Sequence, residues 1–165
     1  MNHLDAIDAK ILEILQEDGR APHSQIAERV GLSQPSVHER VKKLEQSGVI
    51  KGYSAIVDPL ALNLHVLAFI WVQFGEYKTS DVGQAIAEIS QVQEVHHVAG
   101  EDCMLVKVRC HSPGDLEPVL DRIWSSGPVS GTRTTIVFSS YKESSAVSVN
   151  RRLLGLDEEE ERLSA

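Results

Sequence analysis

Polar and basic side chains share the segment Gly31 to Leu44 with an apolar stripe, and their types suit nucleic-acid recognition. Val37 and Val41 recur with Leu44 at helical spacing, which predicts a helix that buries one face. The other positions offer amide, hydroxyl, imidazole and cationic groups, from Gln34, Ser36, His38, Arg40, Lys42 and Lys43. Because glutamine suits adenine and arginine suits guanine or phosphate, the segment predicts a helix lying in a DNA major groove. The alternative is a surface helix with a solvated basic face.

Two shorter helices and a strand are predicted around this segment. Leu4–Glu17 has a wide apolar stripe with acidic residues near its positive N-terminal end, and Ser24–Val30 has a short stripe. A tight Gly-Leu-Ser turn leads into the polar helix, and Gly48 ends it as a left-handed cap. Val49–Asp58 alternates well enough to be a strand. Together these elements predict a winged helix-turn-helix domain over residues 1–58.

A linker over residues 59–65 separates this domain from a second pattern. Asp58-Pro59 breaks the predicted strand, and Asn63 suits a turn. Strands and helices then alternate in the order βαββαβ, over Val66–Phe74, Ser80–Ile89, Glu94–Ala99, Met104–Cys110, Asp115–Ser125 and Val129–Ser139. This order predicts a ferredoxin-like domain over residues 66–142, so the fold class is α+β.

The strand Val66–Phe74 is apolar at almost every position from Val66 to Val72. A ferredoxin-like sheet covers one face with its two helices, so a strand with one wet face should alternate. We therefore expect both faces of this strand to be buried, the second one against another copy of the sheet. A homodimer also suits DNA recognition by paired half-sites.

Charge is unevenly distributed along the chain, whose net charge of −8 over 165 residues is unusual for a DNA-binding protein. Five acidic residues lie in Asp157–Glu161, within a C-terminal extension over residues 143–165, whereas basic residues exceed acidic ones between Gln34 and Gly52. Screening limits phosphate attraction to about 10 Å, so the local charge decides. We interpret the tail as a solvated end, with a DNA mimic as the alternative.

Several function classes are not favoured by the sequence. The N-terminus lacks the apolar core of a secretory signal, and no apolar run is long enough to span a bilayer. Two cysteines suit a reducing cytoplasm, where we expect the protein. A metal set can be assembled from His96, His97, Cys103, Cys110 and His111. Since neighbouring strand residues face opposite ways, we favour packing roles for them and expect neither metal nor cofactor.

Combined along the chain, these motifs resemble the Lrp/AsnC (feast/famine) transcription regulators. The N-terminal likeness rests on Leu4, Asp5, Asp8, Ile11, Asp18-Gly19-Arg20, Gly31-Leu32-Ser33, Ser36-Val37, Arg40 to Glu45, Gly48 to Ile50, and Gly52-Tyr53 with Ala55. The C-terminal likeness rests on Val98-Ala99-Gly100, Leu105 to Val108, and Thr132 with Thr134. The resemblance covers about residues 4–142. It implies a prokaryotic regulator of double-stranded DNA, with dimers assembling into octamers or similar rings.

The same resemblance implies a small effector, often an amino acid, in the C-terminal domain. It places the effector site at the loop Gly100, Glu101, Asp102 and Cys103. Backbone N–H groups around a glycine can hold a carboxylate, and Asp102 suits an amino group. Many members carry Asp followed by an aromatic residue where this chain has Cys103-Met104, which leaves the effector's chemistry open. From the residues alone, an ordinary solvated hairpin turn is the alternative.

An enzyme is the second functional hypothesis, because siroheme decarboxylases share this two-domain architecture. A tetrapyrrole site needs several basic and polar groups converging on carboxylates. Cys103, Met104, Leu105 and Val106 stand at that place here, while the predicted recognition helix keeps its basic face. We therefore expect a DNA-binding regulator and no enzyme.

Overall fold

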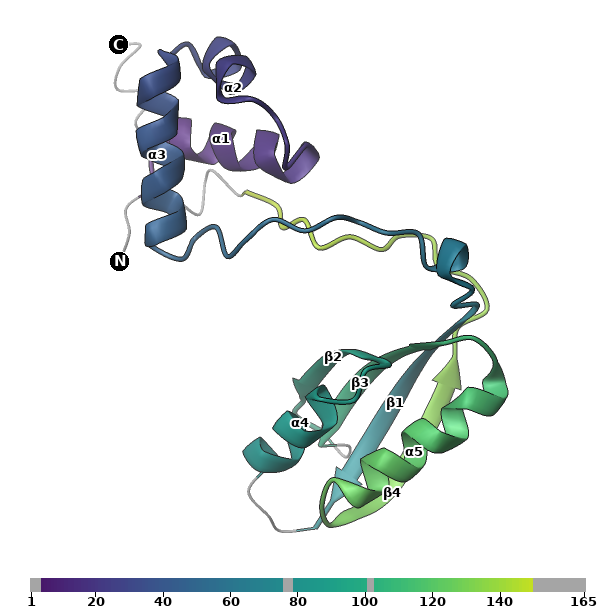
Figure 1. The fold of residues 1–165 in the computed structure, drawn as a ribbon. Helices are drawn as coiled ribbons and strands as arrows, with labels where there is room; N and C mark the ends of the chain where they lie inside the picture. The colour runs from purple at the N-terminus through teal and green to yellow at the C-terminus, as the bar shows by residue number, and fades with distance from the viewer. Residues whose placement is uncertain (1–3, 76–78, 101–102, 150–165) are drawn as a thin grey trace. The chain divides into compact units, whose positions relative to one another are not determined.

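The computed structural model describes residues 4–75, 79–100 and 103–149, which belong to two compact units (Figure 1). The chain divides after Ile56 and after Glu143, so that residues 4–56 and 144–149 belong to one unit and residues 57–143 to the other. The predicted boundaries stand at residues 58, 65 and 142. Each unit has its own hydrophobic core, and the two cores share no residue.

The first unit contains helices α1 (Ala6–Glu17), α2 (His23–Val30) and α3 (Gln34–Gln46). Asp5 caps α1, because its carboxylate accepts the Asp8 backbone N–H at 2.8 Å. Gly31 ends α2 at φ 71° and Gly48 follows α3 at φ 74°, a left-handed conformation that glycine adopts without strain. The helix-turn-helix prediction is therefore confirmed, with helix ends within about two residues of those expected.

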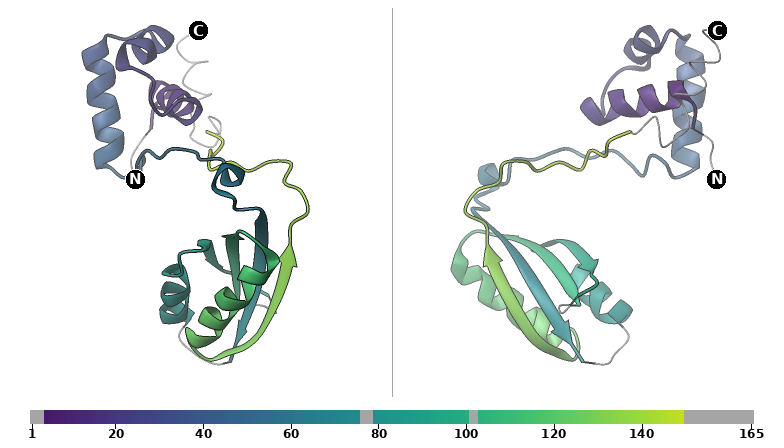
Figure 2. Two further views of the ribbon diagram at one scale, coloured as in Figure 1. Left: turned by 45° about the vertical axis from the view of Figure 1, so that its right-hand side comes forward. Right: turned by 180° about the vertical axis from the view of Figure 1, so that it is seen from behind.

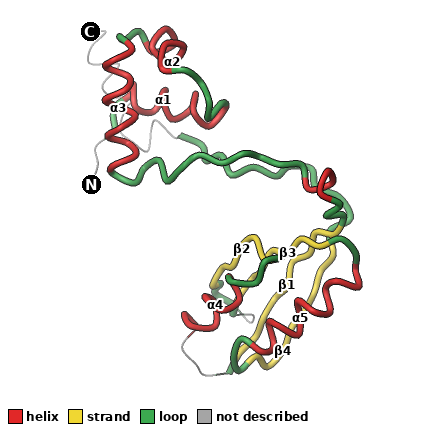
Figure 3. The backbone as a smooth tube through the Cα atoms, viewed as in Figure 1, coloured by secondary structure: helices red, strands yellow, loops and turns green. Residues whose placement is uncertain are grey.

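The predicted strand Val49–Asp58 is wrong. Residues 51–58 are all described, and they form neither helix nor strand (Figure 3). Ile56, an apolar position of the alternating pattern, is 94% exposed. A strand needs a neighbour that supplies its ladder hydrogen bonds, and none pairs with this segment in the described part of the chain. Alternation alone therefore overstated the regularity of this stretch.

The second unit is a four-stranded antiparallel sheet in the order β2-β3-β1-β4 with two helices. Its elements are β1 (Val66–Phe74), α4 (Thr79–Ala87), β2 (Val92–His97), β3 (Met104–Cys110), α5 (Leu116–Ser125) and β4 (Val129–Ile136). Short 3-10 turns lie at η1 (Pro59–Leu62) and η2 (Pro113–Asp115). The chain order βαββαβ confirms the ferredoxin-like prediction. β2 begins two residues before the predicted position and β4 ends at Ile136 rather than Ser139.

Both helices cover the same face of this sheet, as the view from behind shows (Figure 2). Val66, Ala68, Ile70, Val72 and Phe74 of β1 all point to that face and are buried among residues of α4 and α5. The intervening residues of β1 point to the opposite face, which we call the open sheet face. Within the described residues no helix combines the length and the apolar composition needed to cross a bilayer.

Candidate functional site

Helix α3 has a buried face, an outward face and two flanks between them. Val37, Val41 and Leu44 are 0–4% exposed and anchor the helix in the core of its unit. A helix turns about 100° per residue, so the positions opposite this stripe are Pro35, Glu39, Lys42 and Gln46. All four are exposed, and we call them the outward stripe. The remaining residues of α3 lie on its two flanks.

Arg40 lies on the flank next to α1. Its Nη1 donates to Asp5 Oδ2 at 2.6 Å and to Asp8 Oδ1 at 2.7 Å. We call these three residues the Arg40 clamp. Burial opposes the charge of Asp5, but the Asp8 backbone N–H and the Arg40 guanidinium together lower its pKa below the usual range. The clamp joins the start of α1 to the middle of α3, so Arg40 has a structural task that sequence reasoning did not assign.

The other predicted DNA-contact residues have fewer protein contacts. Ser36 shares a hydrogen bond with Ser33 at 2.8 Å between the two hydroxyl oxygens and is exposed. The His38 ring lies on the flank next to α2, with its centroid 5.4 Å from that of His23. Gln34, Lys42 and Lys43 are exposed and have no hydrogen bond or ion pair to any described residue. These groups are free to meet an external partner.

The open sheet face has an apolar half. Leu67 is buried at 6% exposure, whereas Phe69, Trp71 and Leu105 are half-buried without belonging to the helix-side core. The Arg133 guanidinium lies over the Trp71 ring at 5.1 Å from its centroid, a cation–π contact. Trp71 pairs with Leu105 on β3, so these aromatic and aliphatic groups form a continuous surface on the central strands.

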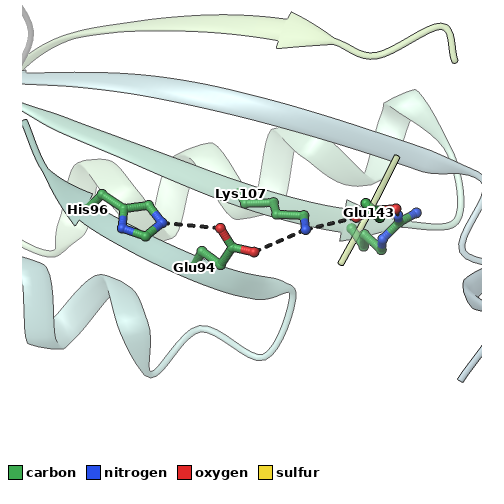
Figure 4. Close-up of polar contacts among 5 residues, drawn as sticks. Glu94, His96, Lys107 and Glu143 are labelled. Carbon is green, nitrogen blue, oxygen red and sulfur yellow. Dashed lines mark hydrogen bonds and ion pairs between the residues drawn. The ribbon is translucent and has the colours of Figure 1, made fainter. Parts of the chain in front are cut away.

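A chain of ion pairs crosses the other half of this face, on β2 and β3 (Figure 4). His96 contacts Glu94 at 3.1 Å, and Lys107 Nζ bridges Glu94 at 3.0 Å and Glu143 at 2.8 Å. Arg109 completes the chain by pairing with Glu143. Lys107 lowers the pKa of Glu143, and Glu143 in turn raises the pKa of Lys107. The charged groups thus neutralise one another.

The predicted effector loop is only partly within the described residues, because Glu101 and Asp102 lie outside them. Gly100 has φ +146°, which disfavours any side chain there. The Cys103 backbone N–H donates to the Val72 carbonyl at 3.0 Å, and its side chain packs against the sheet core. The chain therefore re-enters the sheet at Cys103, which lies beside Val72 of β1.

The residues of the weighed metal set are scattered through the unit. Cys110 is 2% exposed and its thiol donates to the Ser112 carbonyl at 3.3 Å, while burial raises the pKa of that thiol. His111 Nδ1 contacts the Asn63 carbonyl oxygen at 3.0 Å. His96 belongs to the ion-pair chain. Across residues 4–75, 79–100 and 103–149, no group of three or more His, Cys, Asp or Glu side chains is arranged to hold a metal.

Sequence reasoning missed three features of these surfaces. The acidic residues Asp5 and Asp8 suggested only favourable helix charges, because nothing in a pattern reveals a partner more than thirty residues away. Glu143 lies beyond the last predicted strand, and its ion pairs depend on where the chain turns after β4. Glu39 was overlooked among cations, although helical geometry already placed it opposite the buried stripe.

Comparison with known proteins finds similar proteins for both units of the chain. Residues 4–45 match the AsnC-type helix-turn-helix domain, and residues 67–147 match the Lrp/AsnC ligand binding domain. The HTH-type transcriptional regulator FL11 of Pyrococcus horikoshii is 42% identical over 88% of this chain and 97% of its own. An L-methionine complex of a Neisseria meningitidis transcriptional regulator has a TM-score of 0.84 at 29% identity, covering 90% of this chain and 99% of that one. A Mycobacterium tuberculosis feast or famine regulatory protein with L-methionine has a TM-score of 0.80 at 35% identity, covering 87% and 98%.

These relatives are transcriptional regulators, so the decarboxylase alternative is set aside. The helix-turn-helix unit supplies DNA binding and the ferredoxin-like unit supplies the ligand-binding domain. The chain is a DNA-binding transcriptional regulator that belongs to the Lrp/AsnC family.

Proposed function

We propose that this regulator reads double-stranded DNA with α3 and adjusts its assembly on DNA when a small effector binds the second unit. The reading residues are Gln34, Ser36, His38, Lys42 and Lys43, with Arg40 on the flank of the same helix. The observation that carries the proposal is the exposure of Lys42 and Lys43, which have no protein partner among the described residues. Cations left free beside hydrogen-bonding side chains suit phosphates next to base edges.

Salt dependence of DNA affinity tests this assignment. Each phosphate contact releases counterions and contributes about 0.9 to the slope of log affinity against log salt. Replacement Lys42→Ala on the full chain should therefore weaken binding and lower the slope by about one. The matched control is Lys10→Ala, which removes the same charge from an exposed position of α1. Equal affinities and equal slopes for the two variants would remove α3 from the interface.

For the effector we propose the loop from Gly100 to Cys103, with an amino acid as the ligand class. Support comes from the relatives solved with L-methionine and from the glycine conformation, which admits close backbone approach. A thermal-shift screen of the twenty amino acids, beginning with L-methionine, should find a ligand that raises the melting temperature. Calorimetry of Gly100→Val and Asp102→Ala should then show weaker binding than Asp121→Ala, a control on α5. Unchanged affinity in both loop variants would move the site elsewhere.

For the assembly we propose a homodimer through the open sheet face, with dimers joined into an octamer or similar ring. Support comes from Phe69, Trp71 and Leu105, which remain half-exposed on the two central strands. Covering such groups removes apolar surface from water, at about 25 cal/mol per Å² buried. An effector in this unit can change DNA binding only through its different affinity for two subunit arrangements. We place the protein in the cytoplasm, together with the DNA that it reads.

A further inference from the structure

We propose that Glu39, at the centre of the outward stripe, reads a cytosine in the operator and rejects other bases at that position. The inference rests on the proposed reading role of α3 and deepens it. Glu39 is exposed opposite Val37 and Val41, which are buried. It stands one helical turn from Pro35 and just under one turn from Lys42, so it occupies the middle of the face most distant from the core.

Glu39 has no partner of its own in the described part of the chain. Lys42 and Lys43 follow it by three and four residues, the spacings at which helix ion pairs form, yet neither is paired with it. Three other carboxylates of this unit are engaged: Asp5 and Asp8 hold Arg40, and Glu45 accepts the Tyr53 hydroxyl at 3.0 Å. Glu13 and Glu28 also have no partner among the described residues, but they lie on α1 and α2 rather than on the outward stripe of α3. The Glu39 carboxylate therefore remains available for an external donor.

A carboxylate on a DNA-reading face is unfavourable unless it meets a donor. It only accepts hydrogen bonds, and the phosphates around the groove repel it. In the major groove cytosine presents the N4 amino group as a donor, to which glutamate pairs, whereas guanine and thymine present acceptors. Adenine presents its N6 amino donor beside the N7 acceptor, which a carboxylate cannot satisfy because it has no donor of its own. Glu39 would thus lower affinity for most sequences and recover it where the donor is present. Rejection of wrong sites in this manner gives specificity without added affinity.

The immediate neighbours of Glu39 point in other directions, so its role can be tested separately from theirs. Arg40 turns toward α1 and His38 toward α2, so neither side chain lies on the outward stripe. Lys42 lies on the stripe but carries a long, flexible cation suited to phosphate. Glu39 is consequently the acidic group of α3 that faces outward at mid-helix, and its substitution should disturb no contact within the described fold.

Selection of binding sites from random duplex DNA, with the full chain, tests the proposal. The parent should select a motif with a C·G pair that Glu39→Ala no longer requires, with discrimination at that pair falling about 5- to 150-fold. Glu39→Gln should shift the preference there toward adenine, because an amide pairs with adenine's donor and acceptor edge. Glu13→Gln, which neutralises an exposed carboxylate on α1, is the matched control and should select the parental motif.

Two outcomes would overturn the inference, and they differ in what else they remove. If both Glu39 variants select the parental motif with parental discrimination while Lys42→Ala weakens binding, α3 reads DNA but Glu39 does not specify a base. If Lys42→Ala also binds as the parent does, the reading role of α3 falls together with the inference. Far-UV circular dichroism of each variant should match the parent, so that a changed motif reports recognition.

Discussion

Removing the guanidinium of the Arg40 clamp should destabilise the helix-turn-helix unit and leave the second unit unaffected. Arg40→Ala deletes two charge-assisted hydrogen bonds, of 2.6 and 2.7 Å, and leaves two carboxylates facing each other. Hydrogen bonds to charged groups contribute about 1.5–3 kcal/mol, and exposed ion pairs at most about 1 kcal/mol. The Asp8 side chain is 15% exposed, so the Arg40–Asp8 contact lies nearer the upper of these two ranges. The Asp5 side chain is 41% exposed, so the Arg40–Asp5 contact lies nearer the lower one. We expect a loss of about 2 kcal/mol.

Amide hydrogen exchange followed by mass spectrometry measures this loss unit by unit. A destabilisation of about 2 kcal/mol speeds exchange of protected amides in α1 to α3 about 30-fold, since 1.4 kcal/mol is about tenfold. Peptides from α5 provide an internal control. Arg29→Ala is the matched variant, because its single contact with Glu17 at 3.1 Å joins side chains that are 48% and 66% exposed. Equal exchange rates in the two variants would show that the clamp stabilises the unit no more than one exposed ion pair does.

The clamp also separates a positioning role of Arg40 from a direct DNA contact. Asp8→Asn weakens the clamp without touching the guanidinium and removes a negative charge from the unit. If Arg40 acts by holding α3 against α1, the variant should bind DNA less tightly than the parent. If Arg40 acts mainly by contacting DNA, the freed side chain should bind as well or better. Gel shifts at matched salt distinguish the two results.

Three further expectations concern the second unit. Gly127→Ala should cost about 1–3 kcal/mol in a urea titration, because the new Cβ would lie 2.7 Å from the Val82 side chain in the core. Glu143→Gln should make the free energy of unfolding depend less on pH in acid. The pKa of Glu143 is lowered in the folded protein, so the carboxylate stabilises the fold above the unfolded pKa of about 4.3, and this stabilisation disappears as pH falls through the folded pKa. The stabilities of variant and parent should therefore converge in strong acid. Phe69→Asp should leave the fold intact and reduce self-association in sedimentation velocity, and an unchanged sedimentation coefficient would contradict the proposed dimer face.

Hydrophobic periodicity predicted the helices and strands in which buried residues recur at regular spacing. The stripe of Val37, Val41 and Leu44 predicted α3, and the order of strands and helices predicted the ferredoxin-like unit. Both patterns are informative because an apolar face must pack against another element of the fold. The strand predicted over Val49–Asp58 failed for the converse reason, because no strand among the described residues pairs with it to complete its hydrogen bonds. An alternating pattern yields a strand only where another strand of the fold pairs with it.

Site residues were predictable by type but not by direction. Sequence reasoning placed Arg40 with Lys42 and Lys43 as one basic set, yet the acceptors in α1 turn its guanidinium inward. The all-apolar run in β1 was expected to have two covered faces. Its helix side is covered, and Phe69 and Trp71 on the other side are half-exposed in the single chain. Such directions follow from contacts between segments distant in sequence, which a one-dimensional pattern does not contain.

The two hydrophobic cores, as the described residues form them, share no residue, and this has a consequence for how the regulator can diversify. The effects of substitutions that are not in contact add independently, so a substitution in one core does not change the stability effect of a substitution in the other. Lineages can therefore revise the signal they respond to while keeping the same target genes, or acquire new targets while keeping the signal. Recombination between paralogues just after Ile56, where the chain first leaves the helix-turn-helix unit, would exchange one whole core without repacking the other.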